Sequence, residues 1–200
     1  MNTSIKTTPQ ERKLGFRVLF LGMFAIGTGQ TLFIAVLPPY ARGLGLSEVQ
    51  VGFIFSLSAL GWMLMSPFWG KRSDYLGRKS IIILGLIIYS ITTILMGVEF
   101  RLNELGVINL STLFGLLILT RGCYGFLGSG AHSASMAYVA DRTTERERSG
   151  VMAVMGSAFA ISGIVGPGLA SAAVLLGPLV PYFLFGGITC LLYTSDAADE

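Results

Sequence analysis

Charged residues are scarce in this chain: Asp, Glu, Lys and Arg make up 12% of it, whereas apolar residues make up 52%. With a mean hydropathy of +0.70, the chain has more apolar surface than a soluble domain can bury, and lipid is the solvent that accepts it. The net charge of +3 is modest, and the basic residues occur in short clusters between apolar runs. This distribution argues against a nucleic-acid-binding face and predicts an integral membrane protein.

Cysteine and histidine are also rare, with two cysteines and one histidine in the chain. Cys123 and Cys190 lie in separate apolar segments and lack the spacing of a disulfide framework or a metal site. The sequence contains no recognisable nucleophile–base constellation and no phosphate-binding loop. We therefore expect no enzymatic activity, no metal and no cofactor.

The chain consists largely of apolar runs near the roughly 20 residues that a helix needs to cross a bilayer core. Six transmembrane helices are expected, at about residues 16–37, 49–69, 80–98, 112–139, 150–175 and 179–193. The first run is too long to be a cleavable signal peptide. Ser47 with Gln50, and Thr144 with Glu147, have the spacing of capping boxes at the starts of the second and fifth helices.

Lysine and arginine are distributed unevenly over the segments that join these helices. With a cytoplasmic N-terminus, the inside segments carry 11 basic residues, whereas the outside loops carry only Arg42 and Arg101. The positive-inside rule therefore places residues 1–17 in the cytoplasm as an N-terminal segment. Residues 18–193 are expected to form a multi-pass bundle in a bacterial-type inner (plasma) membrane.

The last apolar run has about 15 residues, which is short for a span, and is followed by "YTSDAADE" without a basic anchor. We expect a truncated sixth helix with a non-native tail at residues 194–200, and a native chain that continues. A genuine acidic C-terminus on a six-helix protein is the alternative.

Small residues at helical spacing predict close contacts between helices, because helices in lipid associate through close packing. Glycine recurs every seven residues in the first helix, at Gly15, Gly22 and Gly29. Two further stripes comprise Gly52, Ser56, Ala59, Met63, Ser66 and Gly70 in the second helix, and Ala153, Gly156, Ala160, Gly163, Pro167 and Ala170 in the fifth. We expect all three stripes to pack a tight polytopic bundle.

One formal charge, Arg121, falls well inside an expected span. It is expected to face the bundle or water because burial in lipid is costly, although snorkelling to the outer boundary is the alternative. His132 and Ser135 share its helical face, and Gln30 lies in the first helix. We expect these four residues to line a cavity that binds substrate or protons; hydrogen bonding between helices is the alternative for His132 and Gln30. No acidic residue lies well inside an expected span, so the chain displays no carboxylate for proton coupling.

Four segments resemble the major facilitator superfamily. "GKRSDYLGRK" (residues 70–79) is similar to the family's loop 2–3 motif and lies between the second and third helices, as in that family. "RGCYG" (121–125) resembles its helix 4 arginine–glycine motif, and "DRTTERERSG" (141–150) its loop 4–5 pattern. "SGIVGPGLAS" (162–171) resembles the helix 5 motif of the drug:proton antiporter branch, but Ala170 and Ser171 replace a glycine pair. The resemblance extends over about residues 15–190.

The resemblance implies an all-α membrane protein with twelve helices in two six-helix halves, open alternately to each side. This chain would be the N-terminal half, and the C-terminal half would be missing. A cytoplasmic gate motif is implied, in which Asp74 joins Arg78 and Asp141 or Arg148 to brace the closed gate. The gate motif comprises Gly70, Asp74, Gly77, Arg78, Lys79, Asp141 and Arg148. Gly163, Gly166 and Pro167 would let the fifth helix bend or slide; a static kink is the alternative.

The resemblance thus implies a secondary active transporter that exports small organic or drug-like compounds and draws its energy from a proton gradient. Its partners would be a small-molecule substrate, the bilayer and the missing half, with no nucleic acid. A sugar or metabolite uniporter or symporter of the same superfamily is the alternative. A membrane sensor or assembly protein that moves no solute is the alternative of another class.

Overall fold

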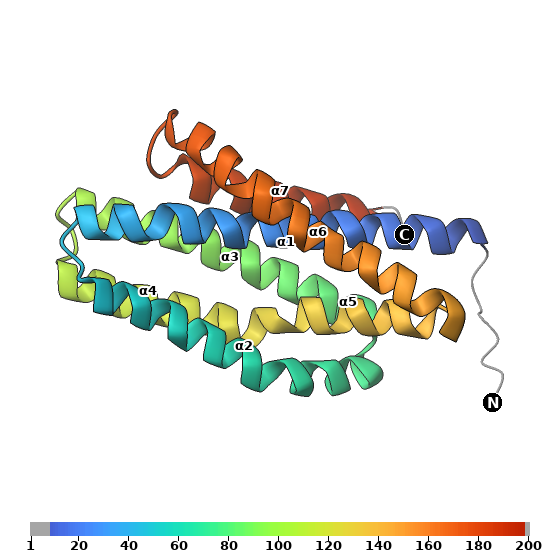
Figure 1. Ribbon diagram of the computed structural model, residues 1–200. Helices are drawn as coiled ribbons and strands as arrows, with labels where there is room; N and C mark the ends of the chain where they lie inside the picture. The colour runs from blue at the N-terminus through green and yellow to red at the C-terminus, as the bar shows by residue number, and fades with distance from the viewer. Residues whose placement is uncertain (1–8, 199–200) are drawn as a thin grey trace.

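The computed structural model describes the backbone of residues 9–198 and the side chains of residues 15–31 and 33–190. Over this range the fold is all-α, with no strand. Its elements are α1 (Pro9–Gly43), α2 (Glu48–Leu76), α3 (Arg78–Glu104), α4 (Leu110–Cys123), the π-helix η1 (Tyr124–Gly128), α5 (Ser129–Asp141), α6 (Glu145–Val174) and α7 (Val180–Ala198). The helices run lengthwise side by side, with α6 and α7 on one side of α1 and with α2, α4 and α5 on the other (Figure 1).

Five helical segments within the described residues are long and apolar enough to cross a membrane. They are Gly15–Gly43 of α1, α2, α3, the continuous segment Leu110–Asp141 and α6. The sixth, α7, has only a shorter apolar stretch, Val180–Cys190, although its helix continues to Ala198. Each of the six expected spans therefore corresponds to one helical segment, which is the architecture predicted from the apolar runs.

Most helices extend beyond the expected runs, for example at the ends of α1 (Gly43) and α2 (Leu76), and three of the differences affect expected segments or site residues. The first helix begins at Pro9, so part of the expected N-terminal segment 1–17 is helical; residues 1–8 lie outside the described part. The third helix continues past Val98 to Glu104. The last helix continues through residues 194–198 rather than stopping near Tyr193, and residues 199–200 of the expected tail lie outside the described part. Hydropathy marks the apolar centre of each helix, but helices continue into polar residues at both ends.

Both predicted capping boxes are present. The Ser47 backbone N–H donates to Gln50 Oε1 at 2.9 Å, and the Gln50 N–H donates to Ser47 Oγ at 3.3 Å. Thr144 and Glu147 form the second box at the start of α6. These reciprocal bonds satisfy backbone donors that the first turn of a helix leaves unpaired, and they fix where α2 and α6 begin.

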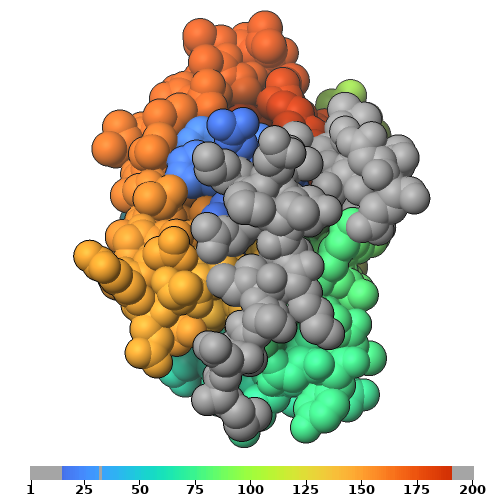
Figure 2. All heavy atoms as spheres, turned by 90° about the vertical axis from the view of Figure 1, so that its right-hand side faces the viewer, coloured from blue at the N-terminus to red at the C-terminus, as the bar shows by residue number. Residues whose placement is uncertain are grey.

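The bundle has two ends. The Gly77 end carries the tight turn between α2 and α3, where Gly77 has φ +91°, and the short α5–α6 loop. The other end, which we call the Gly106 end, carries the loops α1–α2, α3–α4 and α6–α7. Figure 2 views the Gly77 end, where the α2–α3 turn (green) and the start of α6 (orange) both reach the surface.

Most of the small-residue stripes of α2 and α6 do not pack inside this chain, contrary to expectation, although Ala170 of α6 is buried in the core. Gly52, Ser56, Ala59 and Met63 are exposed, as are Ala153, Gly156, Ala160 and Gly163. Only 22% of the most apolar window is buried in α2 and in α6, compared with 39–44% in the other three spans. The buried contacts of α2 are made by a different face, on which Val51, Ile54, Ser58 and Gly61 lie. Two helices therefore present close-packing faces that nothing in the described chain covers.

Candidate functional site

An open cavity of about 470 Å³ lies on one face of the bundle. Its lining comes from five elements and consists of Gln30, Ile34, Phe55, Ser58, Ala59, Trp62, Arg121, His132 and Phe159. Three of the four residues expected to share a cavity, Gln30, Arg121 and His132, line this one. Ala59 belongs to the exposed stripe of α2, so the cavity adjoins the uncovered face of that helix.

Arg121 is buried, with 6% of its surface exposed. Its Nη2 donates to Gln30 Oε1 at 3.0 Å, and Gln30 Nε2 donates in turn to the Tyr124 hydroxyl at 2.9 Å. The guanidinium lies 3.7 Å above the ring of Phe33 and 4.8 Å from that of Tyr124, which are cation–π distances. Its Nε has no hydrogen-bond partner, and no carboxylate of the described residues pairs with it. Arg121 thus does not snorkel: it is a buried cation held by an amide and by aromatic faces.

His132 lies on the cavity wall between two aromatic residues. Its ring centroid is 5.3 Å from that of Phe159 and 6.2 Å from that of Trp62. Its Nδ1 is buried without a hydrogen-bond partner. A ring nitrogen without a hydrogen-bond partner has the capacity to take up a proton.

The fourth span is not one regular helix, although a continuous helix over residues 112–139 was expected. The π-helix η1 inserts a wider turn between Arg121 and His132. It rotates the expected polar face, so Gly125 contacts the backbone of Ser58 and Gly128 lies under the ring of Tyr124. Ser135 is buried but is not among the cavity-lining residues. Sequence spacing assumed 3.6 residues per turn, and the wide turn breaks that count.

Arg78 joins three helix ends at the Gly77 end of the bundle. Its guanidinium pairs with Asp74 of α2 and with Asp141 of α5, where Nε lies 2.9 Å from Oδ2. It also donates to the Gly70 carbonyl at 3.2 Å and to the Ser73 hydroxyl. Asp74, Arg78 and Asp141 of the expected gate motif therefore meet in one cluster.

Ser73 is a member of this cluster that the sequence did not reveal. It is buried and donates to the Gly70 carbonyl at 2.6 Å, so it accepts from Arg78 and fixes the last turn of α2. Arg148, in contrast, does not join the carboxylates: its Nη2 donates to the Ala140 carbonyl at 3.2 Å. Lys79 lies at the start of α3, next to Arg78. Ser73 was overlooked because a serine in a charged loop resembles ordinary surface.

Gly166 lies at the closest approach of α6 to α1. A Cβ at Gly166 would lie 1.9 Å from Thr31 Oγ1, and Thr31 donates to the Ser162 carbonyl at 3.0 Å. Pro167 is inside α6, which continues to Val174, so the helix does not end at the proline. Gly163 is exposed and makes no close contact. Of the three residues expected to let this helix bend, only Gly166 lies in a helix–helix contact that larger residues would block.

Glu99 is a functional candidate that the sequence reading missed. The expected third span ended at Val98, so no acidic residue was counted inside a span, and the longer α3 corrects this. Glu99 has 6% exposure, and Thr120 of α4 donates a hydrogen bond to its Oε1. Its spacing from Met96 and Tyr89, both buried, indicated the inner face of the helix.

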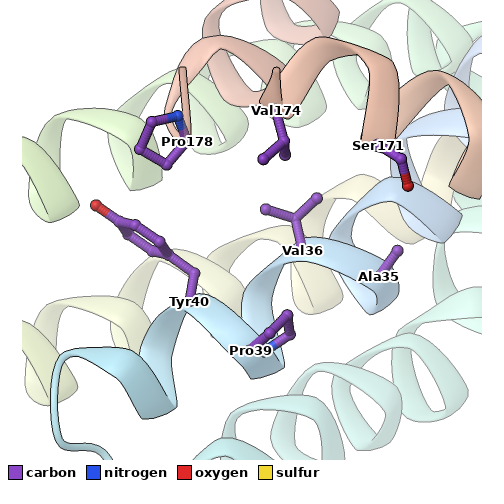
Figure 3. Close-up of a pocket in the computed structure, with 7 residues that line it drawn as sticks. All are labelled: Ala35, Val36, Pro39, Tyr40, Ser171, Val174 and Pro178. Carbon is purple, nitrogen blue, oxygen red and sulfur yellow. The ribbon is translucent and has the colours of Figure 1, made fainter. Parts of the chain in front are cut away.

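A second cavity, of about 430 Å³, lies between α1 and the end of α6. Val36 and Tyr40 of α1 point across it toward Val174 and Pro178 (Figure 3). Its walls are mostly apolar, and none of the expected site residues lines it. We assign it no role in binding.

The chain matches the model of the Major Facilitator Superfamily over residues 19–195. It is 30% identical over 187 residues to "Multidrug resistance protein 2" of Bacillus subtilis (strain 168), covering 94% of this chain and 44% of that protein. It is 27% identical over 176 residues to "Quinolone resistance protein NorA" of Staphylococcus aureus (strain Mu50 / ATCC 700699), covering 88% of this chain and 42% of that protein. The chain therefore spans less than half the length of these relatives. With the all-α bundle and this match, the chain belongs to the major facilitator superfamily of membrane transporters.

Proposed function

We propose that this chain is the N-terminal half of a secondary active transporter that exports small organic, drug-like compounds in exchange for protons. The observation that carries the proposal is the open cavity, where the buried cation Arg121 and His132 lie among aromatic side chains. Such a cavity, mostly apolar with a few polar groups, is typical of sites for small organic molecules. The names of the two relatives, a multidrug and a quinolone resistance protein, support this substrate class.

The second half is proposed on two grounds. The relatives are more than twice as long as the segment they share with this chain. The exposed small-residue faces of α2 and α6 lie beside the cavity and are suited to close helix packing. A second six-helix bundle that packs on these faces would close the cavity and complete an alternating-access transporter.

The Gly77 end is proposed to face the cytoplasm of a bacterial-type inner membrane, with the N-terminus on the same side. The support is the distribution of basic residues, because the α2–α3 turn and the α5–α6 loop carry them while the Gly106 end has few. The cluster around Arg78 then serves as a cytoplasmic gate motif. It ties the ends of α2, α3 and α5 together through Asp74 and Asp141 while the cavity is closed to the cytoplasm.

The cavity chemistry favours aromatic substrates that carry an anionic or electron-rich group. Arg121 lines the cavity and has no carboxylate partner among the described residues, so an anionic group of a ligand would supply the missing counter-charge. Trp62 and Phe159 provide flat apolar surface on the same wall.

The test uses the full-length protein of the source gene in everted membrane vesicles, with fluorescent drug-like compounds and with labelled sugars. A proton gradient should drive uptake of the aromatic compounds, and collapse of the gradient with a protonophore should stop it. If only sugars are taken up, the metabolite carrier replaces the proposal. If no solute moves in a gradient-dependent way, the result favours a membrane sensor. A matched control replaces Ile91 by alanine, because Ile91 is exposed on α3, a helix that contributes no residue to the cavity lining.

A further inference from the structure

Glu99 is the one acidic side chain that is buried among those the structure describes. It lies on α3 five residues before the helix ends at Glu104, which corresponds to about 7.5 Å of helical rise. Its helical face also carries Met96 and Phe100, which are buried in the apolar core at the Gly106 end. A carboxyl group is therefore held inside the bundle but within one and a half turns of its end.

The hydrogen bonding of Glu99 is incomplete. Thr120 of α4 donates to Oε1, whereas Oε2 is buried without any partner. An ionised carboxylate accepts several hydrogen bonds and, inside a protein, usually pairs with a cation. A single hydroxyl donor falls short of that requirement. The free Oε2 is thus the atom at which a proton binds and removes the charge.

The charged and titratable groups of neighbouring elements are engaged elsewhere. On α3 itself, Arg101 pairs with Glu104, to which Tyr40 of α1 also donates. The guanidinium of Arg121 is turned toward Gln30 of α1, and Tyr182 of α7 packs against Phe100. Within the described part, no residue of α2 or α5 forms an ion pair or a hydrogen bond with Glu99. The carboxyl group consequently has no cation that would hold it ionised.

The partner of Glu99 is next to the cavity. Thr120 precedes Arg121, so a single turn of α4 carries both the hydroxyl that holds the carboxyl and the guanidinium that lines the cavity. The π-helix η1 begins three residues after Arg121, and such wide turns inside an α-helix are frequent at functional sites. A change in the charge of Glu99 therefore acts on the turn that positions Arg121.

We propose that Glu99 is a proton-binding site of this transporter, which exchanges its proton at the Gly106 end and is linked to the cavity through the Thr120–Arg121 turn. The inference rests on the proposed proton-coupled export. The step is a simple protonation: a proton from the aqueous phase bonds to Oε2, and the same bond breaks when the proton leaves. The bound proton neutralises the carboxylate. When the proton leaves, the ionised carboxylate needs a further hydrogen-bond donor, and the neighbouring turn of α4 must move to supply it.

The first experiment is infrared spectroscopy of the full-length protein in lipid nanodiscs, titrated between about pH 5 and pH 9, a range that extends above the ordinary carboxyl ionisation. A protonated-carboxyl band should disappear as the pH rises and should be missing in Glu99→Gln. Thr120→Val should shift the midpoint of that titration, and Thr120→Ser should restore it. Glu48→Gln is the matched control, because Glu48 is an exposed carboxylate of the same end that pairs with Arg42. A band that is unchanged over the whole range, or that persists in Glu99→Gln, would overturn the proposal.

The second experiment separates this inference from the proposed function. In vesicles, Glu99→Gln should abolish uptake driven by a proton gradient while retaining gradient-independent exchange of labelled substrate across the membrane. Gradient-driven uptake at the parent rate would overturn the role of Glu99 and leave the proposed function intact. Absence of gradient-driven uptake in the parent would refute the proposed function, and the infrared titration alone then decides whether Glu99 binds a proton.

Discussion

Gly125→Ala should destabilise the protein through a single methyl group. Gly125 lies in the π-helix, where the fourth span makes a close contact with α2. A Cβ at this position would lie 2.4 Å from the carbonyl oxygen of Ser58 and 2.9 Å from its Cα. Both atoms belong to the backbone of α2, so no side-chain rotation can relieve the contact.

The magnitude follows from the distance that the helices must move. An ordinary contact of a Cβ begins at 3.4 Å, so η1 and α2 must separate by about 1 Å, which costs about 1–3 kcal/mol as overpacking. With a change of about 2 kcal/mol, the melting temperature of a chain of this size falls by about 4–8 °C. Because Ser58 lines the cavity, the same displacement should weaken substrate binding.

Gly115→Ala is the matched control in the same span, since no heavy atom lies within 4 Å of a Cβ there. Its stability should stay within about 1 kcal/mol of the parent, because alanine favours a helix slightly over glycine. Thermal unfolding of both variants in the same detergent, followed by circular dichroism, measures the difference. Equal melting temperatures for the two variants would refute the close approach of η1 and α2 on which the reasoning depends.

Four further predictions concern the site and the topology. Asp74→Asn should slow transport markedly. It should change the free energy of unfolding by less than about 1 kcal/mol, since half-exposed ion pairs contribute little to stability. Normal turnover of this variant in a vesicle assay would refute the gate role of Asp74. Arg121→Lys should impair uptake almost as much as Arg121→Ala, because a lysine cannot both reach Gln30 and stack on Phe33. Full uptake activity of the lysine variant would show that a positive charge alone suffices. His132→Gln should alter the pH profile of uptake if the ring takes up protons, and an identical profile would exclude it. With Cys123 and Cys190 replaced, a cysteine at Lys71 should react only with reagents on the cytoplasmic side, and labelling from outside would reverse the orientation.

The fold was largely predictable from the sequence because its signals are local. Apolar runs of about 20 residues mark spans regardless of what they pack against, and the Ser47–Gln50 and Thr144–Glu147 boxes mark helix starts through hydrogen bonds three residues apart. The sequence also pointed to Arg121 as an interior charge, since arginine in an apolar run has few other places to go. Boundaries were less predictable: the third span was ended at Val98, which left Glu99 out.

The small-residue stripes show where local pattern is insufficient. Spacing identified faces of α2 and α6 suited to close packing, but it does not say which partner covers them. Within the described chain those faces are open, and Gly61 and Gly166 make the close contacts instead. Partner choice depends on how all the helices assemble, which no single helix encodes.

By itself the sequence determined that the chain lies in a membrane, the number of its helical segments, two helix starts and the family. Each of these depends on residues that are close along the chain. Only the tertiary structure decided that Asp141 rather than Arg148 joins Asp74 and Arg78, that Gln30 and Arg121 meet across 91 residues, and that Glu99 is buried against Thr120. Such contacts depend on the relative rotation of whole helices, and one wide turn at η1 is enough to change it.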